Sequence, residues 1–418
     1  MRKKEKYILN LCLFYTIYVF LYGIVIKFTI SNSLIFQIKT YIPEFILGSI
    51  TVLTIMKNGI RIKRYLLALL MYSLVVFILN FCLYGFTEQA SYCIRDIYIP
   101  LIAFCFLIQV EVSDEGMKKL TQRLALFFKV YIIAGLVLAL MQQAMGWEWA
   151  STFYTGYSFY GQDPVSKVKI AHNFGLLRAP SLSGNFATFG YYCLIAVIFI
   201  DAYSDKFWKK LFWDILAVVC MVLATNKSAI VAFAVVFILR FTGDIRKKST
   251  WVNRAVMGLI LIVAVSSTFI LMGDNSDGAG LFTSVFARFD IWQEIFSDTS
   301  MLELAVPYKM FMYGSGVEGG LGFWDNTYLY CAFTQGIVGI VLWARVIMKT
   351  YSIRMRNRNK SVQHYVYEMT VVLLILGLTV NVTQGRGYLT HYLMLLAVGT
   401  TIVFGGILPK QSLSKYIE

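Results

Sequence analysis

The chain has 418 residues, a mean hydropathy of +0.66 and only 15% charged residues. Soluble domains carry about 25% charged residues, so an ordinary soluble domain is excluded and a membrane protein is indicated. The formal net charge is +15, but the basic residues are spread over short segments between apolar runs. This distribution argues against nucleic acid as a partner and indicates control of membrane orientation.

Apolar runs of about 20 residues, typical of transmembrane helices, recur along the whole chain. They predict an all-α polytopic membrane protein with about twelve transmembrane helices, in a single domain over 1–418. The predicted spans are 7–27, 40–56, 65–85, 97–110, 124–145, 184–203, 210–225, 228–242, 253–272, 325–345, 365–382 and 389–407. The first follows Arg2-Lys3-Lys4 without a small-residue cleavage pattern, so we interpret it as a retained helix.

The basic residues also predict the orientation of these spans. If the N-terminus is cytoplasmic, every predicted inner segment contains Lys or Arg, as the positive-inside rule requires. These inner segments are 57–64, 118–123, 206–210, 246–248, 349–360 and the C-terminal segment with Lys410. We therefore predict that both termini are cytoplasmic. Two sizeable loops, 146–183 and 273–324, then lie on the outer side.

The larger outer loop, 273–324, contains an amphipathic pattern. Its apolar residues recur at helical spacing and are Phe282, Val285, Phe286, Phe289, Trp292 and Phe296. The pattern predicts a short helix at the membrane interface. Arg288 and Trp292 are four residues apart and share one face of that helix. The alternative for Arg288 is an ordinary arginine that reaches toward lipid phosphates.

Four motifs fall on the predicted outer side. They are R-A-P-S-L-S-G-N-F from Arg178, the turn Thr225-Asn226-Lys227-Ser228, the Arg288/Trp292 pair, and Asp325-Asn326-Thr327-Tyr328-Leu329. In this order, with G-S-G at 314–316 and Gly336-Ile337, they resemble the O-antigen ligase and Wzy-type repeat-unit polymerase superfamily of bacterial surface polysaccharide synthesis. The resemblance covers roughly 120–400 and implies a GT-C-like fold. Two departures stand out: the turn arginine of the family is Lys227 here, and Asp325 replaces the histidine of the ligase branch, which favours the polymerase branch.

The resemblance also implies an activity and its partners. The expected enzyme is a glycosyltransferase of the bacterial cytoplasmic membrane, with its active site on the outer face. It polymerises oligosaccharide repeats carried on undecaprenyl pyrophosphate, which serve as donor and acceptor; membrane lipid and a chain-length regulator protein are further partners. The outer loops carry no spaced His/Cys ligand set, so we predict no metal and no cofactor.

The residues of the motifs suit this chemistry. Arg288 would stabilise the pyrophosphate leaving group, and Asp325 would remove the proton of the acceptor hydroxyl. The predicted substrate-binding residues are Arg178, Lys227, Arg386, Trp292, Asn326 and Tyr328. Asp325 has a structural alternative as a helix N-cap. His172 and His391 are alternative bases.

Two other activities compete with the polymerase. An O-antigen ligase would transfer finished glycan to a different lipid or protein acceptor. A lipid-linked oligosaccharide flippase would hold polar groups along a central cavity, whereas here the charged motifs gather at one face and midspan charge is scarce. The distribution of charge therefore favours a transferase.

Overall fold

The computed structural model describes residues 3–29, 31–108, 113–153, 172–173, 175–204, 207–241, 300–312, 326–355 and 360–378. In chain order its elements are α1 (Lys3–Phe20), α2 (Tyr22–Thr29), α3 (Ser33–Asn58), α4 (Arg64–Tyr84), α5 (Glu88–Cys93), the π-helix η1 (Ile94–Tyr98), α6 (Ile99–Leu107), α7 (Asp114–Phe153), β1 (His172–Asn173), β2 (Leu176–Leu177), the 3-10 helix η2 (Ser181–Ser183), α9 (Phe186–Ala202), α10 (Phe207–Leu223), α11 (Lys227–Phe241), α15 (Met301–Ala305), the 3-10 helix η4 (Met310–Met312), α16 (Thr327–Met355) and α17 (Lys360–Leu376). The two strands pair antiparallel. The predicted interfacial helix around Arg288 and the predicted spans 253–272 and 389–407 lie outside the described residues.

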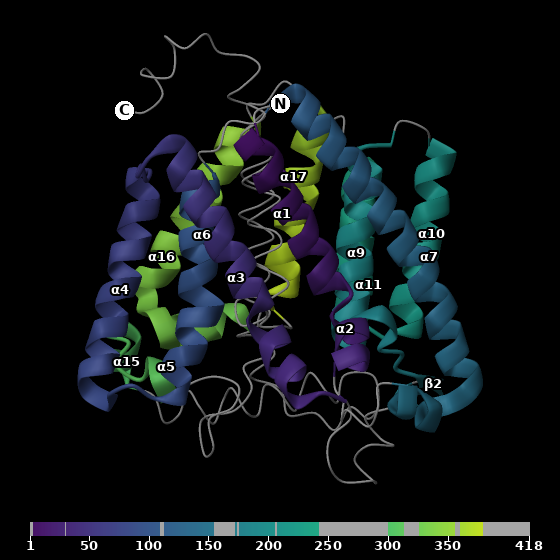
Figure 1. Ribbon diagram of the computed structural model, residues 1–418, viewed down its shortest axis with the longest axis horizontal. Coiled ribbons are helices and arrows are strands. Elements are labelled where there is room, and N and C mark those ends of the chain that lie inside the picture. The colour runs from purple at the N-terminus through teal and green to yellow at the C-terminus, as the bar shows by residue number, and fades with distance from the viewer. Residues whose placement is uncertain are drawn as a thin grey trace.

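The helices form a bundle (Figure 1). α3, α4, α6 and α16 lie on one side, α7, α9, α10 and α11 on the other, and α1 and α17 run between them. The short elements α2, α5, α15 and β2 gather at one end of the bundle, and the N-terminus of the chain lies at the opposite end (Figure 1). We call the end with α2, α5, α15 and β2 the hairpin end.

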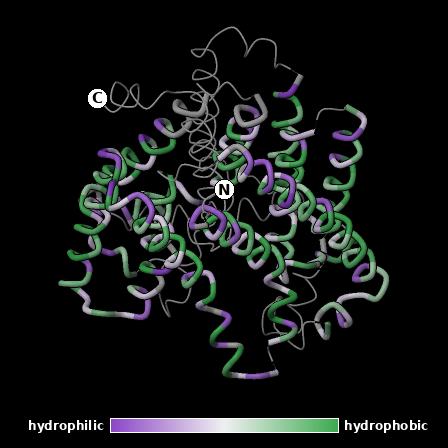
Figure 2. The backbone as a smooth tube through the Cα atoms, turned by 45° about the horizontal axis from the view of Figure 1, so that its top comes forward, coloured by the Kyte–Doolittle hydropathy of each residue, from purple (hydrophilic) through white to green (hydrophobic). Residues whose placement is uncertain are grey.

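Apolar residues run along most of the bundle helices (Figure 2). Within the described residues, three helices are long and apolar enough to cross a membrane: Arg64–Tyr84, Lys118–Ala150 and Thr327–Lys349. Two bent pairs raise the number to five if each pair is one span, namely Lys4–Phe20 with Tyr22–Thr29 and Ser33–Lys39 with Tyr41–Asn58. This part of the chain is therefore an all-α membrane protein, but it does not show the predicted number of about twelve spans.

Bends and short lengths explain the difference. The predicted span 7–27 bends by 72° between α1 and α2, and the predicted span 97–110 begins inside the π-helix η1. α10 and α11 have 17 and 15 residues, which corresponds to lengths of about 25 and 22 Å. The hydrocarbon core of a bilayer is about 30 Å thick, so neither helix reaches across it over the residues that the structure describes.

After the bend between α1 and α2, α2 lies against a segment that is remote in sequence. A Cβ atom at Gly23 would lie 2.2 Å from the backbone nitrogen of Gly184 and 2.5 Å from its Cα atom. Only glycine at position 23 allows this approach. α2 therefore packs directly against η2, the segment that follows Arg178.

The apolar core centres on α9, where every residue from Phe189 to Asp201 is buried. Aromatic rings connect this helix to α1 and α7: Phe20 stacks on Tyr192 with 4.1 Å between ring centroids and packs edge-on against Tyr131. α9 is thus surrounded by protein on all sides. Its apolar sequence reads like a lipid-facing span although its neighbours are other helices.

Candidate functional site

The structure brings two of the four sequence motifs together. The backbone N–H of Ala179, next to Arg178, donates to the carbonyl oxygen of Leu223 at 3.1 Å. The side-chain amide of Asn226 donates to the carbonyl oxygen of Ala187 at 2.7 Å. The segment 178–187 and the turn 223–228, which are well separated in sequence, therefore form one unit at the hairpin end.

Two adjacent glutamines of α7 hold the Arg178 segment in place. Gln143 accepts from the N–H of Leu177 at 3.0 Å and donates back to the carbonyl oxygen of the same residue. The fully buried Gln142 accepts from the N–H of Ser181 at 3.0 Å. These amides replace the hydrogen bonds that a short irregular segment inside a bundle would otherwise lack.

The polar residues of the R-A-P-S-L-S-G-N-F motif serve the backbone and the packing of the site. The Ser181 hydroxyl donates to the carbonyl oxygen of Gly135 at 2.7 Å, and the Ser183 and Tyr131 hydroxyls lie 2.6 Å apart. Asn185 caps α9 by accepting from a backbone N–H at 3.2 Å. The motif is therefore a rigid entry to α9, with its arginine at the start.

Arg178 is half-buried and stacks on Phe186, the first residue of α9. Its guanidinium carbon lies 3.6 Å from the centroid of the Phe186 ring. Such a cation–π contact holds the plane of a guanidinium group in one orientation. The contact therefore positions a cation at the N-terminus of α9, where the helix dipole also favours an anion.

Asn226 positions the second cation. Its side-chain oxygen accepts from the N–H of Ala229 at 3.0 Å and caps α11. A Cβ atom at Gly190 would lie 2.6 Å from the Cβ atom of Asn226, so α9 and the turn are in close contact. Lys227, half-buried, is consequently the first residue of α11.

Backbone strain occurs in both motifs. In the part of the chain that the structure describes, the non-glycine residues with positive φ are Ser181 (φ 43°) and Thr225 (φ 49°). Both lie in the unit formed by 178–187 and 223–228. Left-handed conformations of such residues are unfavourable and cluster at functional sites, so this unit is the best candidate for a binding site.

The fourth motif begins α16 and fastens it to α17. The side-chain oxygen of the fully buried Asn326 accepts from the N–H groups of Tyr328 at 2.9 Å and Leu329 at 3.1 Å. Its amide donates to the carbonyl oxygen of Leu378 at 3.3 Å. The Tyr328 hydroxyl donates to the carbonyl oxygen of Leu374 at 2.7 Å. Both side chains therefore have structural partners, and their predicted contacts with substrate stay a prediction.

Most of the remaining predicted site residues fall in segments that the structure does not describe. Asp325, Arg288, Trp292, Arg386 and His391 lie outside the described residues. His172 belongs to β1. Within the ranges that the structure describes, no three His, Cys, Asp or Glu residues form a group that could hold a metal ion.

Sequence reasoning missed Gln142 and Gln143, which hold the Arg178 segment. A signal was present, because two adjacent amides interrupt the apolar run that follows Lys129. Polar side chains inside a membrane helix usually have a specific partner. The same reasoning also missed that the Ser and Asn residues of the motif are hydrogen-bonded within the protein.

The fold and the candidate site define an all-α membrane protein with two cations at neighbouring helix starts. No protein-family model matches this chain, and no curated protein matches it in sequence.

Proposed function

We propose that this chain is a membrane glycosyltransferase that polymerises undecaprenyl-pyrophosphate-linked oligosaccharide repeat units into surface polysaccharide. It would act on the outer face of the bacterial cytoplasmic membrane, with a GT-C-like arrangement of about twelve spans and both termini inside. The proposal starts from the resemblance of the four motifs to the polymerase superfamily. The observation that supports it most is the contact between the Arg178 segment and the turn that contains Lys227.

This contact supports the binding of a pyrophosphate. Arg178 is held at the start of α9 by Phe186, and Lys227 begins α11, whose cap Asn226 is bonded to Ala187 of α9. Two helix N-termini and two cations thus lie in one unit. Helix N-termini and basic side chains together make favourable sites for phosphate groups.

The proposed reaction is a single displacement. The acceptor hydroxyl oxygen bonds to the anomeric carbon of the donor sugar, and the bond from that carbon to the pyrophosphate oxygen breaks. Asp325 takes the hydroxyl proton. The leaving pyrophosphate keeps the electron pair, and Arg288, Arg178 and Lys227 stabilise its charge.

The test is polymerisation by the purified protein in lipid vesicles with a lipid-linked repeat unit. We expect Arg178→Ala and Lys227→Ala each to reduce chain growth at least about tenfold, because each removes a cation that contacts the leaving group. Lys209→Ala is the matched control, since Lys209 is an exposed cation on α10 at the end away from the turn. Full polymer from a well-folded Arg178→Ala, Lys227→Ala double variant would overturn the proposal.

The product distinguishes the competing activities in the same assay. Transfer of finished glycan to a separate acceptor, without longer repeats, would identify a ligase. Movement of the intact lipid-linked oligosaccharide across the vesicle membrane, without any new glycosidic bond, would identify a flippase.

A further inference from the structure

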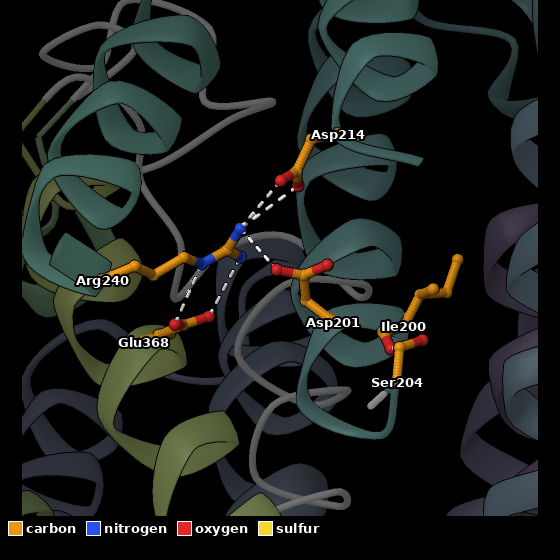
Figure 3. A network of polar contacts seen from close by, with 6 residues as sticks. All are labelled: Ile200, Asp201, Ser204, Asp214, Arg240 and Glu368. Carbon is orange, nitrogen blue, oxygen red and sulfur yellow. Dashed lines mark hydrogen bonds and ion pairs between the residues drawn. The ribbon is translucent and has the colours of Figure 1, made fainter. Parts of the chain in front are cut away.

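A half-buried arginine connects four helices at the end of the bundle away from the turn 223–228 (Figure 3). Arg240 of α11 contacts Asp201 of α9, Asp214 of α10 and Glu368 of α17. Its Nη1 atom lies 2.5 Å from Asp201 Oδ2 and 3.1 Å from Asp214 Oδ2, and its Nε atom lies 3.1 Å from Glu368 Oε1. We call these four residues the Arg240 cluster.

Among the residues that the structure describes, the charges of the Arg240 cluster do not balance. One guanidinium and three carboxylates give a formal charge of 1 − 3 = −2 if all are ionised. The three acidic residues are only 3%, 5% and 4% exposed in the order Asp201, Asp214, Glu368. Lys210, partly buried on α10, is a further cation acting on the two aspartates; with it the sum is still −1. Excess buried charge is unfavourable, and acidic groups in this situation are neutralised by a proton.

The hydrogen bonds single out Asp201 as the least compensated acid. Glu368 receives a two-point contact from Nε and Nη2, at 3.1 and 3.2 Å, and both oxygens of Asp214 contact Nη1. Asp201 contacts Arg240 through Oδ2 alone. The nitrogen that it contacts, Nη1, also contacts Asp214. Its Oδ1 atom is buried and has no hydrogen-bond partner among the described residues.

The charged groups that act on Asp201 come from three neighbouring helices. α10 contributes Asp214 and Lys210, α11 contributes Arg240, and α17 contributes Glu368. Two of the closest groups are carboxylates, which disfavour a third negative charge.

We propose that Asp201 binds one proton from water, and that the Arg240 cluster is a proton-dependent clamp on α9, α10, α11 and α17. With the proton bound, Arg240 faces two carboxylates and one neutral acid, and the four helices stay together. Loss of the proton adds a third negative charge beside Asp214 and Glu368, and their repulsion loosens the contact. The Arg240 side chain is 17% exposed.

The clamp acts on the same helices that carry the candidate site. Asp201 lies about 22 Å along α9 from Phe186, and Arg240 lies about 20 Å along α11 from Lys227, at 1.5 Å per residue. The proton would therefore control how firmly the far ends of both helices are held. This inference stands on the cluster alone and does not require the glycosyltransferase activity.

Infrared spectroscopy of the full-length protein in lipid tests the proposal. At neutral pH we expect one carbonyl band from a protonated carboxylic acid, which shifts when aspartate is labelled with ¹³C and glutamate is not. The band should be lost in Asp201→Asn and should remain in Glu115→Gln, an exposed carboxylate paired with Lys119 on α7. The isotope shift in the wild-type protein decides the matter even if Asp201→Asn does not fold.

Thermal unfolding gives a second readout. Because the folded state holds the proton more tightly, the wild-type melting temperature should fall as pH rises from about 5 to about 7 and then level off. Asp201→Asn mimics the neutral acid, so its melting temperature should match the wild type at low pH and stay flatter across this range. An aspartate-insensitive band, no band at any of these pH values, or stabilisation by Na⁺ in place of the proton would overturn the proposal.

Discussion

The side-chain amide of Asn226 reaches the carbonyl oxygen of Ala187, and this 2.7 Å hydrogen bond joins the start of α11 to the first turn of α9. The other end of the same amide caps α11 through the N–H of Ala229. One side chain therefore fixes the relative position of two helix starts. Arg178 and Lys227 lie at these starts, so their spacing depends on Asn226.

Two substitutions of Asn226 test its two roles, the cap of α11 and the hydrogen bond to Ala187. Asn226→Ala removes the cap and the bond to Ala187, and we expect a loss of about 1–3 kcal/mol of unfolding free energy because the carbonyl stays buried. Asn226→Asp keeps an acceptor for the cap but sets a second oxygen of this buried side chain against the carbonyl oxygen of Ala187, so it should also be destabilised although the cap remains. Thermal unfolding of both variants in one detergent measures the difference. Equal stability of Asn226→Ala and the wild type would show that the bond contributes nothing.

Gly23→Ala tests the contact between α2 and the Arg178 segment. The new Cβ atom would meet the backbone of Gly184 at 2.2 Å, and backbone cannot move aside as a side chain can. We expect a loss of about 1–3 kcal/mol or more, typical of overpacking in a well-packed interior. Gly48→Ala is the matched control, because nothing lies within 4 Å of its Cβ position. A Gly23→Ala protein as stable as Gly48→Ala would contradict the close packing.

The Glu303–Lys309 pair gives a pH-dependent prediction at the hairpin end. The Lys309 ammonium donates to the Glu303 carboxylate at 2.6 Å, and this bond raises the pKa of Lys309 above its ordinary value of 10.5. A raised lysine pKa stabilises the folded state below the ordinary pKa, and the contribution disappears as pH rises through the folded value. The pair is partly exposed, so its contribution is about 0.2–1 kcal/mol.

The comparison is between the wild type and Lys309→Gln, measured by thermal unfolding near pH 8 and above pH 10.5. We expect the wild type to be the more stable at the lower pH and the two to converge at the higher pH. Titration of other groups affects both proteins alike and cancels in the difference. A difference that grows as pH rises would reverse the assigned sign.

The helical class follows from the sequence, but the number of spans does not. Counting apolar residues identifies α4 and the part of α7 before Gly146 correctly, because both are long and apolar. The same count misses the bend after α1 and the close approach of Gly23 to Gly184 far along the chain. It also cannot separate α9, which is buried by other helices, from a helix that faces lipid. Apolar content alone does not report what covers a helix.

The candidate site was predictable only in part, for a similar reason. The basic residues of the loops place Arg178 and Lys227 on one predicted side of the membrane, and the structure shows that their segments are in contact. The hydrogen bonds that make the contact come from Gln143, Asn226 and backbone groups. No spacing in the sequence reveals them. The Arg240 cluster escaped for the same reason, since Arg240 and Glu368 are 128 residues apart.

The last prediction concerns Asp325 and Asn326, which adjoin at the start of α16. Sequence alone leaves two roles open for Asp325, a helix cap and a catalytic base. The N–H groups of Tyr328 and Leu329 are taken by Asn326, so the cap does not need Asp325. We therefore expect Asp325→Asn to fold like the wild type and to lose chain growth by about 10²–10⁴-fold, the usual contribution of a positioned base.

The neighbouring residue is the control for this experiment. Asn326→Ala should lose about 0.5–2 kcal/mol of stability, as expected when a helix loses its cap. Arg288→Ala should weaken donor binding as well as turnover, and Arg288→Lys should restore only part of it, because lysine lacks the bidentate fork. Donor affinity, polymer length and melting temperature are measured for each variant. If Asp325→Asn still makes full-length polymer, the base lies elsewhere, with His172 and His391 the next residues to replace.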